Sequence, residues 1–389
     1  MTRTHQHRPD YVFHPGETLA ETLEELSMTQ KQLSERTGRP LKTINEIIKG
    51  RAAITADTAI QLERATGVPA SFWNSAQRRY EQFQAEQAEA VALQRDRAWL
   101  RRLPLKEVAA LKWIPECSDP VEQLRALLDF FGVAGVGELE RMWLKPRAAF
   151  RQSKAFQSKP FAVAAWLRAG ERAANSVPTA PFDKTKFAQA LREIRLLTAK
   201  TSGPVQQEVV TLCAGCGVAI VFIPEVSGTR AYGASRWLGP EKALIQLSLR
   251  GKTDDKLWFT FFHEAGHLLK HGRKDFFIED DNDGTDPATR AKEREADTFA
   301  SRLLIPPEEY AELLALRPLT ASKIESFARK LGIAPGIVVG RLQHERIVTF
   351  KQFNGLKRKV QFSEQPASST SGPRLNTEPS DSKTGVSQN

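Results

Sequence analysis

The chain of 389 residues has few cysteines and no long apolar run. Three cysteines are too few for a disulfide framework, so a reducing compartment is expected. No run approaches the ~18 apolar residues that a membrane-spanning helix needs. The first residues, Thr2 to Arg8, lead into no apolar signal core. We therefore expect a cytoplasmic protein with no membrane partner, and we find no internal repeat.

Two of the cysteines form a lone C-x-x-C pair, Cys213 and Cys216. A structural zinc site would need a second pair, and only Cys117 remains. The favoured interpretation is two small residues entering a buried strand. A redox switch is the alternative.

Composition is that of a soluble protein, and the charge balance favours a polyanionic partner. Charged residues make up 26% of the chain, hydrophobic residues 41%, and the mean hydropathy is −0.40. This length predicts two or three domains, each large enough for its own core. The net charge of +10, with a pI near 9.5, favours a polyanion but does not show which surface is basic.

The pattern H-E-x-x-H stands at His263-Glu264-Ala265-Gly266-His267, within an apolar stretch. Asp254 and Asp255 offer N-terminal capping chemistry and Gly272 a C-terminal stop, so one helix fits between them. Two histidines four residues apart share a helix face and can bind one Zn²⁺, with Glu264 beside them as general base. A surface helix with two histidines is the plain alternative, but burying these side chains without a metal would be costly.

A third ligand is expected on a second helix, which begins at Asp286-Pro287 and stops at Pro306-Pro307. Glu293 and Asp297 share a face of this helix. Glu293 is the predicted third ligand, and Asp297 is predicted to accept the outer N–H of a ligand histidine. Glu295 points to another side of the helix and is the weaker candidate. The alternative for Glu293 is a solvated charge in a charged helix.

His271 follows His267 by four residues and is not expected to be a ligand, since it lies well around the helix from His263. It either contacts the metal ligands or donates a hydrogen bond to the transition state. An exposed histidine favoured by the helix dipole is an equal alternative. Tyr232 and Arg230 are the other candidates for such a donor.

The implied chemistry is hydrolysis of a peptide bond, in which Glu264 takes a proton from water and passes it to the leaving amine. Residues 218–223 and 242–249 are short, rich in branched apolar residues and predicted to be strands. An edge strand beside the metal helix could hold a peptide substrate in an extended conformation.

The segment from Ala231 through His263-Glu264 to Pro306 resembles ImmA/IrrE-type metallopeptidase domains. The resemblance covers about residues 205–350, and both helices carry their motifs in order. It implies a zincin-like domain with a short β-sheet, zinc held by two histidines and a glutamate, and regulated cleavage of a repressor protein.

The N-terminal segment has the helix pattern of a helix-turn-helix domain. Residues 16–27 form a first amphipathic helix; Thr29 caps a second over 30–37 that Gly38 ends. Pro40 opens a third over 41–49, which Gly50 ends. Residues 55–66 and 69–76 complete a five-helix bundle with Phe72 and Trp73 in its core. In the third helix the inward-facing residues are predicted to be Leu41, Ile44, Ile47 and Ile48.

The side chains predicted to contact DNA combine amide, hydroxyl and charged groups that suit base edges and phosphates. They are Gln30, Lys42, Thr43, Asn45, Glu46 and Lys49. A plain helical bundle or a dimerisation module is the alternative. The segment from His14-Pro-Gly-Glu to Phe72-Trp73 is similar to HigA-type antidotes of the XRE helix-turn-helix group, with Ser34 where alanine is common. This resemblance, over residues 10–80, implies a homodimer on double-stranded operator DNA.

The remaining segments carry weaker signals. Residues 81–200 are a predicted helical linker and middle region, in which a charged helix over 77–102 either connects domains or pairs two chains. Trp113, Trp143, Trp166 and Phe130-Phe131 are predicted core. Residues 360–389 are a predicted disordered tail. The expected fold is mainly α, with a helical bundle, a helical middle and a small α+β zincin-like domain.

Two functions fit this organisation. One is a DNA-binding regulator whose zinc endopeptidase cuts a regulatory partner, such as a toxin or repressor. The other is an antitoxin or repressor whose zincin domain only senses or binds a partner.

Overall fold

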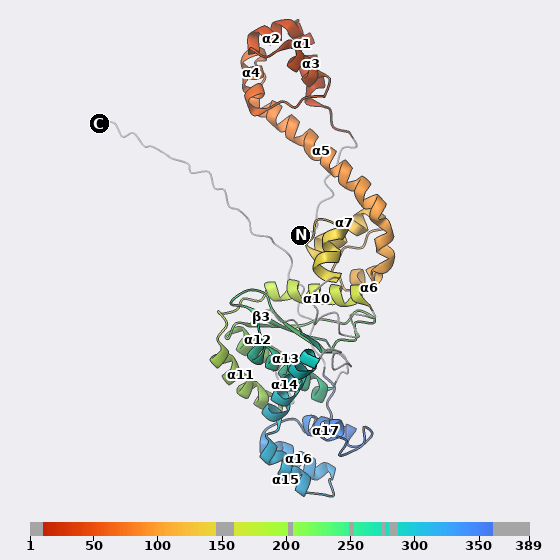
Figure 1. The fold of residues 1–389 in the computed structure, drawn as a ribbon, viewed down its shortest axis with the longest axis vertical. Coiled ribbons are helices and arrows are strands. Elements are labelled where there is room, and N and C mark those ends of the chain that lie inside the picture. The colour runs from red at the N-terminus through yellow and green to blue at the C-terminus, as the bar shows by residue number, and fades with distance from the viewer. Residues whose placement is uncertain are drawn as a thin grey trace, which may run out of the picture. The chain divides into compact units, whose positions relative to one another are not determined.

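The computed structural model describes residues 11–144, 159–200, 205–248, 253–273, 277–279 and 287–360. The chain divides into two compact units, Met1–Arg97 and Ala98–Asn389. Both are mainly helical, and the second contains a small sheet, as expected for the fold class (Figure 1). Among the described residues, no helix combines the length and apolarity that a membrane crossing requires. The predicted tail beyond Val360 and the helix start at Asp286 lie outside the described residues.

Five helices form the N-terminal unit: α1 (Pro15–Glu25), α2 (Gln30–Thr37), α3 (Leu41–Ile48), α4 (Ala56–Thr66) and α5 (Ala70–Asp96). Their core includes Leu33, Ile44, Ile47 and the fully buried Trp73. Two predictions were wrong here. Phe72 is 45% exposed and Leu41 is 47% exposed, because each stands in the first turn of its helix on the side away from the bundle.

The helix ends follow from local chemistry. Thr29 and Gln32 form a reciprocal capping box at the start of α2, and Gly38, with φ of 71°, ends it in the left-handed conformation. His14 caps α1 by accepting a hydrogen bond from the Gly16 backbone N–H. At Gly16 a side chain would collide with the Ile47 carbonyl, so glycine allows α1 to pack closely against α3.

The last helix of the bundle is longer than predicted. A separate helix over 69–76 followed by another from 77 is wrong, because α5 runs without interruption for 27 residues. No glycine or proline stands between Ala70 and Asp96, so nothing breaks the backbone pattern. A 3₁₀ turn, η1 (Arg97–Arg102), follows it.

The C-terminal unit begins with helices that precede its sheet. They are α6 (Leu105–Ala110), α7 (Pro120–Phe131), α8 (Val136–Leu139), the π-helical turn η2 (Glu140–Leu144), α10 (Pro160–Asn175), α11 (Lys184–Leu197) and α12 (Val205–Ala214). The predicted core aromatics Phe130, Phe131, Trp143 and Trp166 are buried, and Trp113 is half-buried. Phe187, Leu191 and Ile194 of α11 share one core with the helices beneath the sheet.

The sheet has four strands in the order β1-β3-β2-β4: β1 (Val218–Phe222), β2 (Gly233–Trp237), β3 (Ala243–Leu247) and β4 (Phe277–Glu279). β1 and β3 are parallel, whereas β2 is antiparallel to both of its neighbours. The strands predicted at 218–223 and 242–249 are confirmed as β1 and β3 with slightly shorter bounds, and residue 249 lies outside the described residues. The prediction that Cys213 and Cys216 enter a strand was wrong, because Cys213 lies in α12 and Cys216 in the turn after it, both buried as free thiols.

Helices cover both faces of the sheet (Figure 1). On one face, the Trp166 indole of α10 donates to the Ile223 carbonyl at 3.1 Å, and the Gln246 side chain of β3 donates to the Trp166 carbonyl at 2.7 Å. On the other face lie α13 (Asp254–Lys270) and α14 (Pro287–Leu304). Beyond them are α15 (Pro307–Ala315), α16 (Ala321–Leu331), α17 (Pro335–His344) and a final 3₁₀ turn, η4 (Asn354–Leu356). Because successive side chains of a strand point to opposite faces of the sheet, β3 faces α10 on one side and α13 on the other.

Candidate metal centre and helix-turn-helix surface

The H-E-x-x-H residues lie in α13, whose predicted extent is confirmed but whose predicted ends were partly wrong. Thr253, not an aspartate, is the N-cap residue, and Asp254 and Asp255 occupy the first turn. The Asp254 carboxylate instead accepts the backbone N–H of Asp255 and of Arg358. At the other end, His271 leaves the helix with extended backbone angles, one residue before the expected stop at Gly272.

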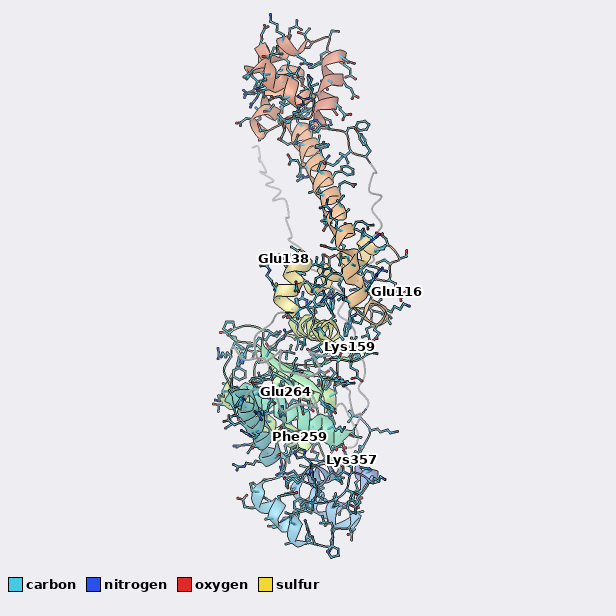
Figure 2. All side chains as sticks on the ribbon, turned by 45° about the vertical axis from the view of Figure 1, so that its right-hand side comes forward. Glu116, Glu138, Lys159, Phe259, Glu264 and Lys357 are labelled. Carbon is cyan, nitrogen blue, oxygen red and sulfur yellow. The ribbon has the colours of Figure 1, made fainter. Side chains whose placement is uncertain are left out.

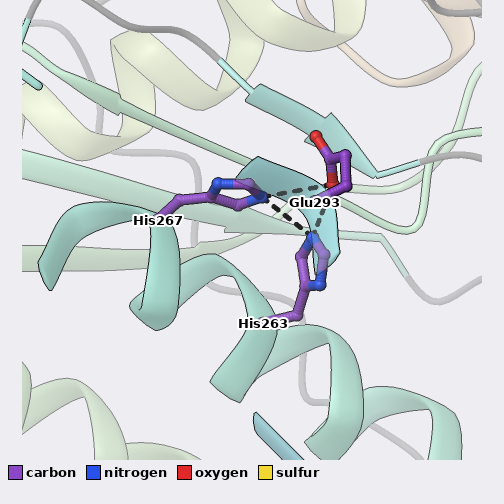
Figure 3. A group of neighbouring side chains, drawn as sticks. All are labelled: His263, His267 and Glu293. Atoms are coloured by element: carbon purple, nitrogen blue, oxygen red, sulfur yellow. Dashed lines mark hydrogen bonds and ion pairs between the residues drawn. The ribbon is translucent and has the colours of Figure 1, made fainter. Parts of the chain in front are cut away.

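His263, His267 and Glu293 bring three ligand atoms together (Figure 3). The two Nε2 atoms are 2.9 Å apart, and Glu293 Oε2 lies 3.1 Å from that of His263 and 3.3 Å from that of His267. Ligands about 2.05 Å from a tetrahedral zinc ion are separated by about 3.3 Å. The cluster therefore has the size and the donor set of a His₂Glu metal site.

Close packing of two helices carries Glu293 to the histidines. A Cβ added to Gly266 would lie 3.0 Å from Phe299 Cδ1 and 3.3 Å from Ala296 Cα. Gly266 of α13 thus faces Ala296 and Phe299 of α14 at short range, and any side chain there would press the helices apart. The glycine of the motif therefore has a structural role between the two metal-site helices.

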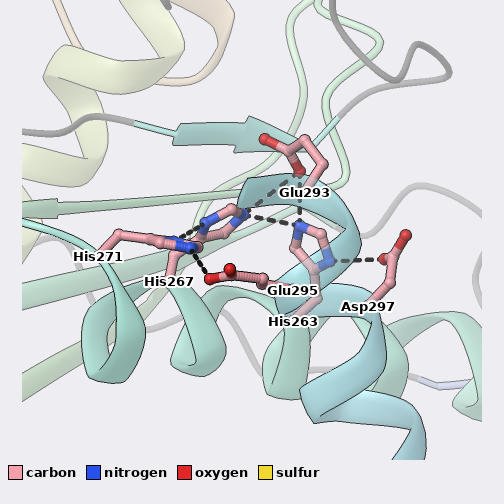
Figure 4. A network of polar contacts seen from close by, with 6 residues as sticks. All are labelled: His263, His267, His271, Glu293, Glu295 and Asp297. Atoms are coloured by element: carbon pink, nitrogen blue, oxygen red, sulfur yellow. Dashed lines mark hydrogen bonds and ion pairs between the residues drawn. The ribbon is translucent and has the colours of Figure 1, made fainter. Parts of the chain in front are cut away.

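The remaining nitrogens of both histidines have polar neighbours (Figure 4). His263 Nδ1 lies 2.9 Å from Asp297 Oδ1, and His267 Nδ1 lies 2.9 Å from His271 Nδ1. His271 Nε2 lies 3.1 Å from Glu295 Oε2. Asp297 and His271 therefore each contact a histidine of the three-residue cluster, whereas Glu295 contacts His271. Such outer contacts fix the tautomer and orientation of ligand histidines.

Glu264 is fully buried beneath β2. Among the described residues, neither carboxylate oxygen has a hydrogen bond of ordinary geometry, although the Ser235 hydroxyl is near enough to lower the pKa of Glu264. Burial is the main cause that raises its pKa to about 8. A Cβ added to Gly233 would lie 2.6 Å from Thr260 Cγ2 and 2.9 Å from Glu264 Oε1, so this position of β2 accepts only glycine without movement. A buried carboxylate left without a donor is costly unless a ligand supplies one.

The three ligand groups of the cluster differ in their pKa shifts. Burial lowers the pKa of His267 to about 4, which leaves a neutral imidazole with a lone pair. Burial alone would raise the pKa of Glu293, but its hydrogen bonds with both histidines lower it to about 2. Burial also opposes the charged form of His263, yet its contact with Asp297 and the nearby Glu279 raise its pKa. Metals bind deprotonated ligands, so His267 and Glu293 are in the binding form, whereas His263 would release a proton when a metal binds.

Sequence reasoning missed Glu279 of β4. Burial raises the pKa of this carboxyl group, and the described residues provide no partner for its Oε2. A strand of three residues has no periodic pattern by which to detect it. Of the two other proposed donors, half-buried Tyr232 gives its backbone N–H to the Glu279 carbonyl, whereas Arg230 is exposed in a left-handed conformation.

In the N-terminal unit, the residues predicted to contact DNA lie on α2 and α3. Lys42 and Lys49 are exposed, while Gln30, Thr43, Asn45 and Glu46 are half-buried. Asn45 donates to the Gln30 side chain at 3.4 Å, which links the two helices, and Lys42 Nζ lies 3.8 Å from Glu46. The Ser34 hydroxyl donates to the Arg39 carbonyl, so serine fits within the turn that joins them.

Family comparisons agree with this geometry. Residues 19–73 match the helix-turn-helix family model, and residues 221–343 match the IrrE N-terminal-like domain, a peptidase family. The chain joins a helix-turn-helix domain to an IrrE-like domain. The first match runs from within α1 to the start of α5, and the second runs from the end of β1 into α17 and includes α13 and α14, which carry the metal-site residues.

Two solved structures are similar to part of the chain. A candidate antidote protein of a plasmid maintenance system from Nostoc punctiforme is 31% identical, with 22% of this chain and 92% of that one covered and a TM-score of 0.21. An addiction module antidote protein of a HigA family from Coxiella burnetii is 33% identical, with 21% and 91% covered and a TM-score of 0.20. No match was found among curated proteins.

Proposed function

We propose that this chain is a cytoplasmic DNA-binding regulator whose IrrE-like domain is a zinc-dependent endopeptidase. Its substrate is a regulatory protein, such as a toxin or a repressor. The observation that carries the proposal is the cluster of His263, His267 and Glu293, whose ligand atoms all lie within 4.8 Å of one another. It stands beside Glu264, a buried carboxyl group whose neighbouring donor among the described residues is the Ser235 hydroxyl.

The donor set fits zinc in particular. Two imidazoles and one carboxylate form the three-ligand set typical of catalytic zinc, which keeps a fourth position open. A bound zinc ion would supply Lewis-acid chemistry, since it acidifies water and polarises a carbonyl. Asp297 and His271 would hold the two imidazoles in the required orientation.

The chain's own general base is Glu264. In peptide hydrolysis a water oxygen bonds to the carbonyl carbon, the C–N bond breaks, and one proton moves from the water to the departing nitrogen. Glu264 would accept that proton and pass it on, because a carboxylate with a pKa near 8 can both take and return a proton near neutral pH. Gly233 leaves the space that this carboxylate occupies.

DNA binding is proposed for the surface of α2 and α3, with α3 in the major groove. Lys42 and Lys49 would contact phosphates, and Asn45, Thr43 and Glu46 would reach base edges. Gln30 at the start of α2 would contact the backbone. The net charge of +10 supports a polyanionic partner, and a homodimer would match a two-fold symmetric operator.

The test is proteolysis that depends on one carboxylate. The chain and its Glu264→Gln variant are each expressed with the products of neighbouring genes, and new protein termini are identified by mass spectrometry. We expect a cut that appears only with the unaltered chain, while both forms retain zinc. If neither form cuts any protein although both hold zinc, the proposed endopeptidase is contradicted, and a domain that only senses or binds its partner accounts for the site.

A further inference from the structure

A cavity of about 280 Å³ lies on the side of α13 that faces α17. Its apolar lining consists of Phe259, Leu304, Ile305, Ile337 and Phe350. Thr260 and Glu279 line the wall that is nearest to the sheet. In Figure 2 the labels of Glu264, Phe259 and Lys357 follow one another downward, and the last two of these residues line the cavity.

The cavity adjoins the general base. Thr260, which lines it, is one helical turn before Glu264 in α13. If Gly233 carried a Cβ atom, that atom would lie within 3 Å of both the Thr260 methyl group and a carboxylate oxygen of Glu264. These two groups are therefore close to each other. A peptide bond held beside Glu264 would therefore have a neighbouring side chain within reach of the cavity.

We propose that this cavity is a specificity subsite that accepts one large apolar side chain, such as leucine or phenylalanine, of the peptide beside Glu264. The inference deepens the proposed function and rests on it, because the peptide is the segment to be cut. Its volume is just below the 300–1,000 Å³ usual for pockets that enclose whole small molecules, which suits a single side chain.

An exposed aromatic ring at the cavity supports this occupant. Phe350 is 71% exposed, although it contributes to the lining. The exposed ring is therefore accessible to a side chain that enters the cavity. A bound leucine or phenylalanine would bury part of that ring together with the cavity wall.

The charged groups in the wall are largely paired within the chain. Lys357 Nζ lies 2.6 Å from Asp255 Oδ2, with both side chains mostly buried, and Arg341 pairs with Glu345. Of the other charged groups in the lining, Glu279 would repel an acidic side chain, whereas Lys256, whose Nζ lies 5.6 Å from the Tyr232 ring, would attract one. Because most of the lining is apolar and burying a charge there is costly, the cavity should favour apolar over acidic side chains.

Residues 350–358, which include the lining residues Phe350 and Lys357, are bonded to the first turn of α13. The backbone N–H of Asp254 donates to the Arg358 carbonyl at 2.9 Å, and the backbone N–H of Arg358 donates back to the Asp254 carboxylate at 3.0 Å. Together with the Lys357–Asp255 pair, these bonds fix the segment that follows Phe350. A preorganised subsite of this kind binds without the cost of ordering its walls.

The experiment measures binding apart from cleavage. The full-length Glu264→Gln variant, loaded with zinc, is immobilised and exposed to a synthetic peptide pool with one randomised position, and retained peptides are identified by mass spectrometry. We expect leucine and phenylalanine to be enriched about tenfold over alanine, and aspartate to be depleted. If peptides with every residue at the randomised position are retained equally, the subsite is contradicted. It is also contradicted if no peptide is retained.

Variants made in the same background localise the effect. Phe350→Ala removes an exposed ring and should reduce the apolar enrichment several-fold; Ser301→Phe should fill the cavity and abolish it. Met142→Ala is the matched control, because Met142 is 64% exposed and does not line the cavity. Enrichment that is unchanged by Phe350→Ala contradicts the assignment. If the unaltered chain cuts no protein while the Glu264→Gln form still enriches apolar residues, the subsite stands and only the endopeptidase is rejected.

Discussion

Asp297 Oδ1 lies 2.9 Å from His263 Nδ1, on the side of the imidazole opposite Glu293. This contact leaves the Nε2 lone pair of His263 directed at the cluster. We predict that Asp297→Ala lowers zinc affinity by about 10- to 100-fold, whereas Asp297→Asn, which keeps an acceptor, loses less. Competition with a chromophoric chelator measures the affinity. Glu308→Ala, an exposed carboxylate on α15, is the control. Equal affinity of the Asp297→Ala and Glu308→Ala variants would show that Asp297 does not orient the ligand.

The contact between Gly233 and the general base predicts a steric effect. A methyl group at Gly233 would overlap Thr260 and crowd Glu264, so Gly233→Ala should lower the free energy of unfolding by about 1–3 kcal/mol. Chemical denaturation measures the change. Gly239→Ala serves as the control, because a Cβ there meets no atom within 4 Å. A Gly233→Ala variant as stable as the Gly239→Ala variant would contradict the close approach of β2 to α13.

The helix-turn-helix surface predicts a change in salt dependence. Combining Lys42→Ala with Lys49→Ala should weaken DNA binding and reduce the slope of log K against log salt by up to about 2, since each phosphate contact contributes about 0.9. Fluorescence anisotropy over a salt series measures the slope. Lys184→Ala with Lys351→Ala makes the same change in charge with exposed residues of the other unit. Equal slopes for the two double variants would remove α3 from the interface.

Local patterns in the sequence predict helices well but do not show what each helix contacts. The start of α2 at Thr29 and its end at Gly38 follow from capping chemistry within a few residues. Leu41 and Phe72 illustrate the limit, since an apolar residue in a first turn can face away from the bundle. Their exposure depends on where neighbouring helices pack, which periodicity within one helix does not contain.

The metal cluster was accessible to sequence reasoning because its spacing reflects helix geometry. His263 and His267 share a face of α13, as do Glu293 and Asp297 on α14, so two motifs suffice to propose one site. Glu279 and the cavity were not accessible. Glu279 stands on a three-residue strand, and the cavity joins Phe259, Ile337 and Phe350 from distant segments. Contacts of that kind depend on tertiary packing alone.

Zinc stoichiometry in a matched pair of variants tests the central claim, that side chains from α13 and α14 form one metal site. The chain is purified, dialysed against a weak chelator and analysed for metal by mass spectrometry. The account predicts about one zinc per chain, a sharp loss in Glu293→Ala and retention in Glu295→Ala, because Glu295 contacts His271 rather than the cluster. Zinc retained in Glu293→Ala and lost in Glu295→Ala would contradict it and move the ligand set outward to His271 and Glu295.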